Sequence, residues 1–254
     1  DALLSKEIDL AVHSMKDVPT FFPDGLHLSR ITKREDARDA LLSRNKVAFK
    51  DLPKGAKIGT SSLRRQSQLM NVRPDFVIEQ LRGNVDTRIK KLKEGQYDAI
   101  ILAAAGVRRL GLAENVTEYI EPEISLPAIG QGALGIECRV DDRELNDMIA
   151  FFNHSDPRVC VPGERALLRR LEGGCQVPIA CYGVIKNNKL SLAGLVASVD
   201  GKRIIKETLE GPQADAEKLG VTLAENLLKR GADVILREVY GQNADYSGDK
   251  LLEN

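Results

Sequence analysis

The sequence contains no tryptophan, and aromatic residues make up only 4% of its 254 residues. Proteins that bind single-stranded nucleic acid stack bases on aromatic side chains, so this composition disfavours that class of partner. No run of 18 apolar residues is present, which argues against a membrane-spanning helix. The three histidines are far apart and form no ligand pattern, so we expect no metal site.

Cysteine is also scarce. The four cysteines, Cys138, Cys160, Cys175 and Cys181, form neither a C-x-x-C pair nor a dense framework, which indicates reduced thiols and a cytoplasmic protein. The first residue is Asp1 rather than methionine, and "DALLSKEIDLAVHS" is typical of a helix end followed by a strand. We therefore expect the chain to enter a fold already in progress.

The net charge of zero hides an asymmetry. Residues 38–113 contain 16 Lys and Arg against 7 Asp and Glu, an excess of nine positive charges that the rest of the chain balances. An asymmetry of this size points to an anionic ligand held in that region. A solvated basic face explains the charge alone equally well.

Apolar runs and helical patterns alternate between residues 40 and 125. Strand-like runs at 56–60, 75–81 and 98–106 are separated by helical patterns at 61–72 and 84–95. This order predicts an α/β domain with a parallel sheet.

The flanking segments predict two further units. "ALGIECR" at 133–139 is expected to return the chain to a sheet begun by residues 8–32, followed by a helical run at 141–152. Beyond residue 155 we expect a small α+β domain. Its elements are a helix to Leu171, strands at 179–186, 189–199 and 203–211 joined by Asn187-Asn188 and Asp200-Gly201 turns, and a helix at about 214–230.

"KIGTSSLRRQ" predicts an anion site. A strand ends at Thr60, Ser61 and Ser62 can cap the next helix, and the free N–H groups of that first turn attract anions. Arg64 and Arg65 add planar donors suited to carboxylate or phosphate. An ordinary helix cap beside two solvated arginines is the alternative.

The same pattern follows the next two strands. "QLRGNVDTR" places Arg82 at a strand end and Arg88 on a helix opened by Asn84, and "GVRRLG" adds Arg108 and Arg109. Open α/β sheets bind ligands at the carboxyl ends of their strands. Arginines at three successive strand ends therefore favour a binding site over coincidence.

"AVHSMKDVP" is a second candidate segment. An apolar strand ends in Ser14, Lys16 and Asp17, and a carboxylate beside an arginine-rich cleft is suited to acid, base or cation-stabilising roles. A surface ion pair is the common alternative for Lys16 and Asp17. We expect His13, among alternating apolar residues, to be a core histidine with its polar atoms satisfied.

"RRLEGGCQVPIACYG" places Cys175 directly after Gly173 and Gly174. The glycines are typical of a helix end, and cysteine is most often a small buried apolar residue. A functional role for Cys175 therefore needs support from the rest of the chain.

That support comes from a resemblance. "HSMKDVP", "GTSSLRRQ", "LRGNVDTR", "LPAIGQGALGIECR" and "LEGGCQVPIA", in this order, resemble the porphobilinogen deaminase (hydroxymethylbilane synthase) family over essentially the whole chain. The resemblance implies an α/β fold with two doubly wound domains like those of periplasmic binding proteins, plus a small α+β C-terminal domain. The implied boundaries are 1–34 with 127–152 for domain 1, 35–126 for domain 2 and 153–254 for domain 3.

The resemblance also implies an activity. The family is a transferase that condenses four porphobilinogen molecules head-to-tail into hydroxymethylbilane, with release of ammonia, in tetrapyrrole biosynthesis. A dipyrromethane cofactor would be attached to Cys175 through a thioether, and Asp17 would be the catalytic carboxylate together with Lys16. The residues implied to bind cofactor or substrate carboxylates are Ser14, Lys16, Thr60, Ser62, Arg64, Arg65, Arg82, Arg88 and Arg109.

The implied protein is a cytoplasmic monomer whose partner is porphobilinogen, with neither nucleic acid nor membrane. The family has a further strand-helix-strand region before the position of Asp1, so we expect an unpaired sheet edge in domain 1. Two other functions remain as alternatives. A non-catalytic protein that closes two lobes over an acidic ligand would not need Cys175, and a nucleic-acid-binding protein would show steep salt dependence.

Overall fold

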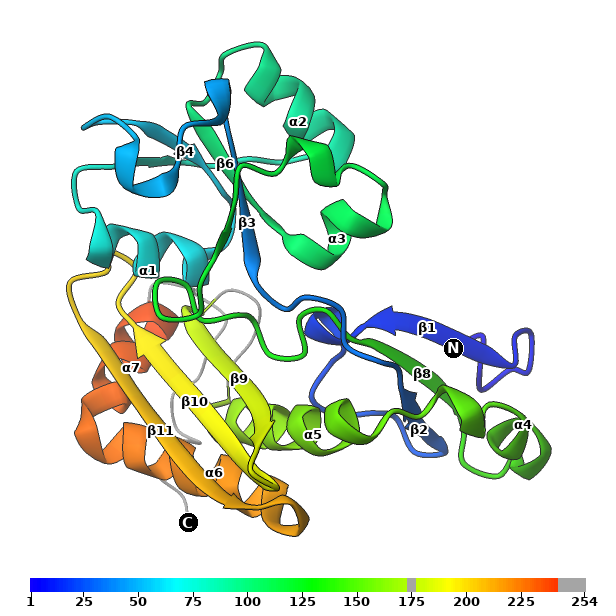
Figure 1. The fold of residues 1–254 in the computed structure, drawn as a ribbon. Coiled ribbons are helices and arrows are strands. Elements are labelled where there is room, and N and C mark those ends of the chain that lie inside the picture. The colour runs from blue at the N-terminus through cyan, green and yellow to red at the C-terminus, as the bar shows by residue number, and fades with distance from the viewer. Residues whose placement is uncertain (173–176, 242–254) are drawn as a thin grey trace.

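The structure is a computed structural model that describes residues 1–172 and 177–241. Its strands form three separate sheets, and Figure 1 shows the three arranged around the centre of the molecule. Within the described residues, no helix is long and apolar enough to cross a membrane.

The first sheet has three antiparallel strands in the order β1-β8-β2. Strand β8 (Leu134–Arg139) lies between β1 (Leu10–Ser14) and β2 (Leu26–Ile31). The prediction that "ALGIECR" returns to this sheet is confirmed. The chain then continues into α4 (Arg143–Met148).

Strand β1 is paired on one edge only. Within the described residues its sole partner is β8, so the other edge of β1 is unpaired, as expected. The prediction that His13 is a core histidine is wrong. Its side chain is 35% exposed, and Nε2 contacts Glu137 Oε2 at 2.7 Å on the neighbouring strand β8.

The second sheet has five strands in the order β5-β4-β6-β3-β7. The predicted parallel part is confirmed for β4 (Lys57–Gly59), β5 (Val77–Glu79) and β6 (Ala99–Ala103). Two strands run antiparallel, β3 (Asp39–Ser43) beside β6 and β7 (Glu118–Ile120) at the edge. The sheet is therefore mixed rather than wholly parallel.

Helices cover both faces of this sheet. They are α1 (Leu63–Val72), α2 (Val85–Lys93) and α3 (Ala104–Arg109). Successive residues of β3 point to opposite faces, so Leu41 packs in the cluster with Leu69 of α1 while Leu42 packs with Ile89 of α2. Strands buried on both faces read as continuous apolar runs, as these do.

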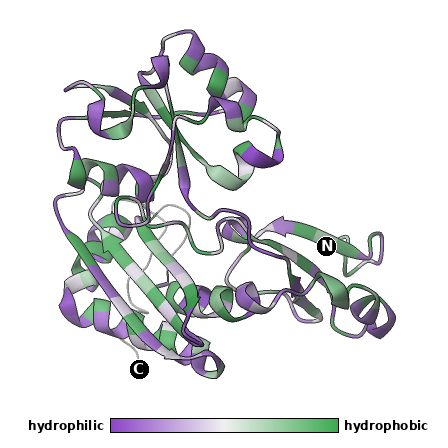
Figure 2. Ribbon diagram, viewed as in Figure 1, coloured by the Kyte–Doolittle hydropathy of each residue, from purple (hydrophilic) through white to green (hydrophobic). Residues whose placement is uncertain are grey.

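The third sheet is antiparallel, in the order β11-β10-β9. Its strands are β9 (Ile179–Lys186), β10 (Lys189–Ala197) and β11 (Ile204–Pro212). Helices α5 (Ser155–Arg170), α6 (Ala216–Leu227) and α7 (Asp233–Gly241) pack against it, and Figure 2 shows mostly hydrophobic residues along β9 and β10. The predicted α+β arrangement is confirmed. Its first turn uses the left-handed conformation at Asn187 (φ 49°) and Asn188 (φ 62°).

Two segments, 32–38 and 121–133, join the first and second sheets. Both are held by Glu164, a fully buried residue of α5. Its Oε1 accepts hydrogen bonds from Arg34 Nη1 at 2.5 Å and from the Gly183 amide at 2.9 Å, and its Oε2 accepts one from the Gly130 amide at 2.7 Å. One carboxylate thus connects α5 with both joining segments and β9.

The third sheet also contacts the second. Asn71 of α1 donates through Nδ2 to the Gly201 carbonyl at 2.9 Å, in the turn between β10 and β11. Gly201 has φ 70°, and a Cβ added there would overlap the Ser67 carbonyl. Only glycine fits this approach.

Candidate active site

A cavity of about 690 Å³ lies where the strand ends of the first and second sheets meet the two joining segments. It is lined by the end of β1, the loop after β5, the end of β6, part of α1 and residues of both joining segments. Six residues predicted from the sequence line it: Ser14, Lys16, Asp17, Arg65, Arg88 and Arg109. These side chains come from four separate parts of the chain, and the fold brings them together at one cavity.

Lys16 and Asp17 lie in a single 3-10 turn, η1 (Met15–Asp17), directly after β1. Met15, 1% exposed, packs in the core beneath this turn. Anchoring Met15 directs the two polar neighbours towards the cavity. Burial lowers the pKa of Lys16, and the positive charge of Arg65 lowers it further.

Asp39, the first residue of β3, is fully buried beside the cavity. Its carboxylate accepts hydrogen bonds from Arg64 Nη1 at 2.9 Å and Arg65 Nε at 3.0 Å. It also accepts from Ser125 Oγ at 2.8 Å and Gln131 Nε2 at 3.0 Å. Burial alone would raise the pKa of Asp39, but the two arginines outweigh it and hold the pKa well below its usual range.

The guanidinium groups of Arg64 and Arg65 are therefore not free on the surface. Both are buried, and the guanidinium of Arg64 also donates to the Leu126 carbonyl at 2.7 Å. Arg64 does not line the cavity, whereas Arg65 does, with Nη1 donating to the Ile101 carbonyl at 3.1 Å. Both arginines are thus paired with Asp39, whereas the alternative interpretation expected two arginines exposed to solvent.

Thr60 and Ser62 lie at the start of α1. The cap prediction is confirmed, since Ser62 Oγ accepts from the Arg65 amide at 3.4 Å. Thr60 is buried and its Oγ1 accepts from the Ser62 amide at 3.2 Å. Neither residue lines the cavity.

Arg82 lies in the loop after β5, and Arg88 lies on the helix α2 that follows it. Asn84 caps α2 as predicted, accepting from the Thr87 amide at 2.9 Å. Arg88 lines the cavity and donates through Nε to the Gly83 carbonyl at 2.7 Å, whereas Arg82 is exposed, contacts Gln80 and does not line it. The two arginines of this motif thus occupy different environments.

Residues of the joining segments also line the cavity, and none of them was predicted to be a site residue. They are Thr32, Lys33, Glu35, Gln131, Gly132 and Ala133. Their segments are irregular, so no periodic pattern marked them. Arg108, noted beside Arg109 at a strand end, lines the cavity too and contacts Glu35 at 3.5 Å.

Cys175 lies outside the described residues. Cys138, Cys160 and Cys181 are buried free thiols, and burial raises the pKa of Cys160 to about 12. Buried thiols of this kind are poor nucleophiles. Across residues 1–172 and 177–241, no cluster of His, Cys, Asp and Glu is suited to a metal ion.

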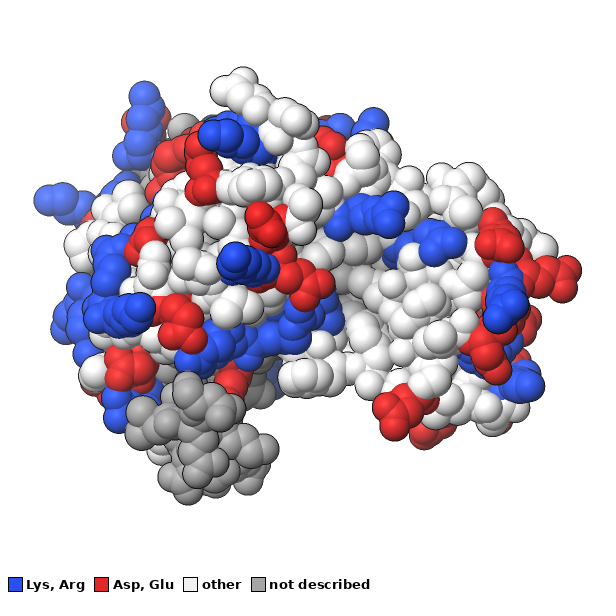
Figure 3. Space-filling model, turned by 90° about the horizontal axis from the view of Figure 1, so that it is seen from below, with Lys and Arg blue, Asp and Glu red and all other residues white. Residues whose placement is uncertain are grey.

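The excess of positive charge lies within residues 38–113 of the sequence. On the face seen in Figure 3, Lys and Arg are interspersed with Asp and Glu, and uncharged residues cover most of the part that carries β1, β2 and β8.

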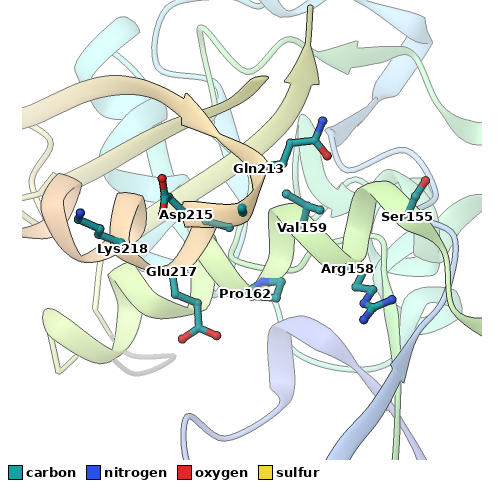
Figure 4. A pocket seen from close by; sticks show the side chains of 10 residues that line it. Ser155, Arg158, Val159, Pro162, Gln213, Asp215, Glu217 and Lys218 are labelled. Atoms are coloured by element: carbon teal, nitrogen blue, oxygen red, sulfur yellow. The ribbon is translucent and has the colours of Figure 1, made fainter. Parts of the chain in front are cut away.

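A second hollow of about 630 Å³ lies between the first turns of α5 and α6. Figure 4 shows it bordered by Arg158 and Lys218 as well as Asp215 and Glu217, a balance of charges that favours no anion.

Comparisons with known proteins identify similar chains. Residues 1–147 match the family model described as porphobilinogen deaminase, dipyromethane cofactor binding domain, and residues 158–229 match porphobilinogen deaminase, C-terminal domain. The chain is 61% identical over 240 residues to the porphobilinogen deaminase of Geobacter metallireducens, and 60% identical to that of Geobacter sulfurreducens. Each alignment covers 94% of this chain and 75% of the relative.

Among solved structures, a putative methionine-binding lipoprotein from Bacillus subtilis matches 61% of this chain and 73% of its own, with 14% identity and a TM-score of 0.41. A substrate binding domain of a putative amino acid ABC transporter from Streptococcus pneumoniae matches 66% of this chain and 70% of its own, with 17% identity and a TM-score of 0.40. Likeness of this extent says nothing about function.

Proposed function

The chain belongs to the porphobilinogen deaminase family, and we propose that the cavity between its first and second sheets is where porphobilinogen is bound and joined. The enzyme is a transferase of tetrapyrrole biosynthesis that works with a dipyrromethane cofactor. Four porphobilinogen units are condensed head-to-tail into hydroxymethylbilane, and each addition releases ammonia.

One observation carries the assignment of the site. A carboxylate, Asp17, faces the same cavity as Arg65, Arg88 and Arg109. Porphobilinogen carries an acetate, a propionate and a cationic aminomethyl group, so its ligand site needs several cations and one carboxylate. Charge-assisted hydrogen bonds from arginine suit the carboxylates.

Asp17 is proposed to stabilise positive charge. As the carbon–nitrogen bond of the aminomethyl group breaks and ammonia leaves, the remaining carbon and its ring become cationic. A fixed carboxylate stabilises that charge without reorganisation at the moment of reaction. Lys16, on the same 3-10 turn, is proposed to hold a substrate carboxylate beside it and thereby orient the ring.

The cofactor fits the chemistry of this cavity, because a dipyrromethane with its acetate and propionate groups needs the same cationic side chains as the substrate. When bound, it supplies a ring with a free carbon to which the first substrate unit is joined. We propose Cys175 as its attachment point, and Ser14, Arg65, Arg88 and Arg109 as the residues that hold its carboxylates.

Four of the residues predicted from the sequence act from outside the cavity lining. Thr60 and Ser62 shape the first turn of α1, and Arg64 acts through Asp39 to position Arg65. Arg82, exposed in the loop after β5, is proposed to bind the growing chain at a later stage.

We further propose three domains, at 1–34 with 127–152, at 35–126 and at 153–254. We also propose that the protein is a monomer located in the cytoplasm.

The test is intact mass spectrometry of the purified protein before and after brief exposure to porphobilinogen. We expect an adduct with the mass of two linked pyrrole units on Cys175, absent from Cys175→Ser, and further additions of one unit accompanied by ammonia. Active protein with an unmodified Cys175 would refute the attachment point. An adduct that does not grow would show that this chain lacks elongation.

A further inference from the structure

Arg165 of α5 is 5% exposed and binds the chain directly after the turn that carries Asp17. Its Nη1 donates to the Val18 carbonyl at 3.1 Å, and its Nη2 donates to the Pro19 carbonyl at 2.5 Å. Both bonds come from one planar guanidinium, whose donors have a fixed relative geometry. One side chain of α5 therefore holds the two peptide groups that follow this turn.

The positive charge of Arg165 has no ionic partner. Among the described residues no carboxylate forms an ion pair with it, and burial lowers the pKa of its guanidinium. The preceding residue, Glu164, pairs with Arg34 instead. Burying a charge without a counterion is destabilising. Within the described part of the chain, its hydrogen bonds go only to the two carbonyls, so holding them is the role that its burial supports.

The turn that carries Asp17 depends on such external contacts. The backbone hydrogen bond that closes it, from the Val18 amide to the Met15 carbonyl, is 3.4 Å long and therefore weak. On the side of β1, the Met15 amide donates to the Ala133 carbonyl at 3.0 Å. Arg165 provides the anchor on the other side. The carboxylate thus lies between one anchor from a joining segment and one from α5.

The same face of α5 packs against this turn. Val161, one helical turn before Arg165, is fully buried in a cluster with Met15 and Val18. In the sequence, α5 is the helix that precedes Cys175. A single helix therefore contacts that turn and leads to the proposed attachment point of the cofactor.

We propose that Arg165 is a positioning residue for the condensation, which holds the turn so that the Asp17 carboxylate stays in place as the cationic carbon forms. This rests on the proposed function. A carboxylate stabilises developing charge best when it is preorganised, and a misplacement of about 1 Å can lower a rate by about 10². Arg165 does not line the cavity, so it acts through Asp17 and touches no substrate.

The experiment compares the wild type with Arg165→Met, which keeps a long side chain and removes its donors. Cofactor content is checked by intact mass, and single-turnover release of ammonia gives the rate per loaded molecule. Calorimetry gives the dissociation constant of an unreactive pyrrole that has the acetate and propionate groups but no aminomethyl group. We expect the rate to fall about tenfold to a hundredfold and the dissociation constant to stay unchanged.

A double variant tests whether the effect passes through Asp17. In Asp17→Asn, the negative charge that Arg165 is proposed to position is absent. Adding Arg165→Met to that variant should therefore lower the rate little further, whereas two independent defects would multiply.

Arg139 provides a matched control. It is 9% exposed and also donates to two backbone carbonyls, those of Leu3 at 3.0 Å and Ile8 at 2.8 Å. Unlike Arg165, it also pairs with two carboxylates, so its loss should destabilise the fold at least as much. It does not line the cavity. In the fraction that folds and is loaded, Arg139→Met should keep the wild-type rate.

Four results would overturn the proposal: an unchanged rate in Arg165→Met, an equal loss of rate in Arg139→Met, losses that multiply in the double variant, or a loss of rate matched by weaker binding of the unreactive pyrrole. If Arg165→Met does not fold, Arg165→Lys keeps a cation but lacks the planar pair of donors, and the same measurements decide. Absence of ammonia release from the loaded wild type would instead contradict the proposed function.

Discussion

Arg65 donates through Nε to Asp39 Oδ1 at 3.0 Å, so an arginine that reaches the cavity is held from behind by a buried carboxylate. Arg64 shares that carboxylate at 2.9 Å without reaching the cavity. The two adjacent arginines of "SSLRRQ" thus have a common anchor and different environments. Their substitution should separate anchoring from ligand binding.

We expect Arg64→Leu and Arg65→Leu both to destabilise the fold, by about 3 to 5 kcal/mol, because each leaves the buried charge of Asp39 with fewer partners. Arg65→Leu should lose more cofactor content than Arg64→Leu in the fraction that folds, since Arg65 lines the cavity and Arg64 only helps to position it. Urea denaturation gives the stability and intact mass gives the loading. Unchanged stability in both variants would contradict the role of Asp39 as an anchor.

The stability that Asp39 contributes should depend on pH in a defined direction. Its pKa in the folded protein is lowered, against about 3.9 in an unfolded chain. The contribution is therefore complete above about pH 4 and is lost as the pH falls further towards the folded-state value. Compared with Asp39→Asn in urea denaturation, the wild type should lose its advantage below about pH 4, and a constant difference at all pH values would contradict this.

Asp17 should be sensitive to charge more than to size. Asp17→Asn keeps the shape and removes the negative charge, so turnover should fall by about 10² to 10³, the usual effect of losing a preorganised electrostatic contact. Asp17→Glu keeps the charge and should retain measurable turnover. The assay is single-turnover release of ammonia from porphobilinogen, in protein whose cofactor content has been checked by mass. Better activity in the Asn variant than in the Glu variant would require another mechanism.

Arg88→Leu should weaken binding of the unreactive acetate- and propionate-bearing pyrrole about tenfold or more, because a hydrogen bond to a charged group is worth about 1.5 to 3 kcal/mol. Lys90→Leu, on the same helix but outside the cavity and 76% exposed, removes the same charge and is the control. Calorimetry distinguishes them. Equal weakening in both variants would mean that the charge of α2 as a whole, rather than Arg88, attracts the ligand.

Gly132→Ala should destabilise the protein more than Gly111→Ala. Both glycines have positive φ, 91° and 72°, so each alanine meets the same backbone penalty. Only at Gly132 would the new Cβ also collide with a carbonyl oxygen, that of Glu35 at 2.5 Å, whereas Gly111 has nothing within 4 Å. Thermal denaturation of both variants measures the difference, which we expect to exceed about 1 kcal/mol. Equal losses would show that the joining segment adapts.

Local sequence signals predicted the elements well because their causes are local. Ser62 and Asn84 cap helices with their own side chains, and the strand ends placed Asp17, Arg88 and Arg109 at one cavity. What the sequence could not reveal depends on partners distant along the chain. Asp39 meets Gln131 across 92 positions, and His13 meets Glu137 across 124.

The same distinction explains the error at His13. Alternating apolar residues around His13 indicated a strand buried on one face, but neither periodicity nor composition reveals whether another element covers that face. Gln131 shows the converse case. No periodic pattern in "AIGQGA" predicts where its amide lies, and only the fold shows that Nε2 donates to the Ala37 carbonyl and to Asp39.

The position of β8 between β1 and β2 has a consequence for biosynthesis on the ribosome. The middle strand of this sheet begins at Leu134, roughly one hundred residues after β2 ends at Ile31. At about 5 to 20 residues per second, translation leaves the two outer strands without their shared neighbour for roughly 5 to 20 seconds. The entire second sheet emerges in that interval, so it can fold first. Until β8 is made, β1 and β2 have unpaired edges, which chaperones that bind nascent chains can protect from aggregation.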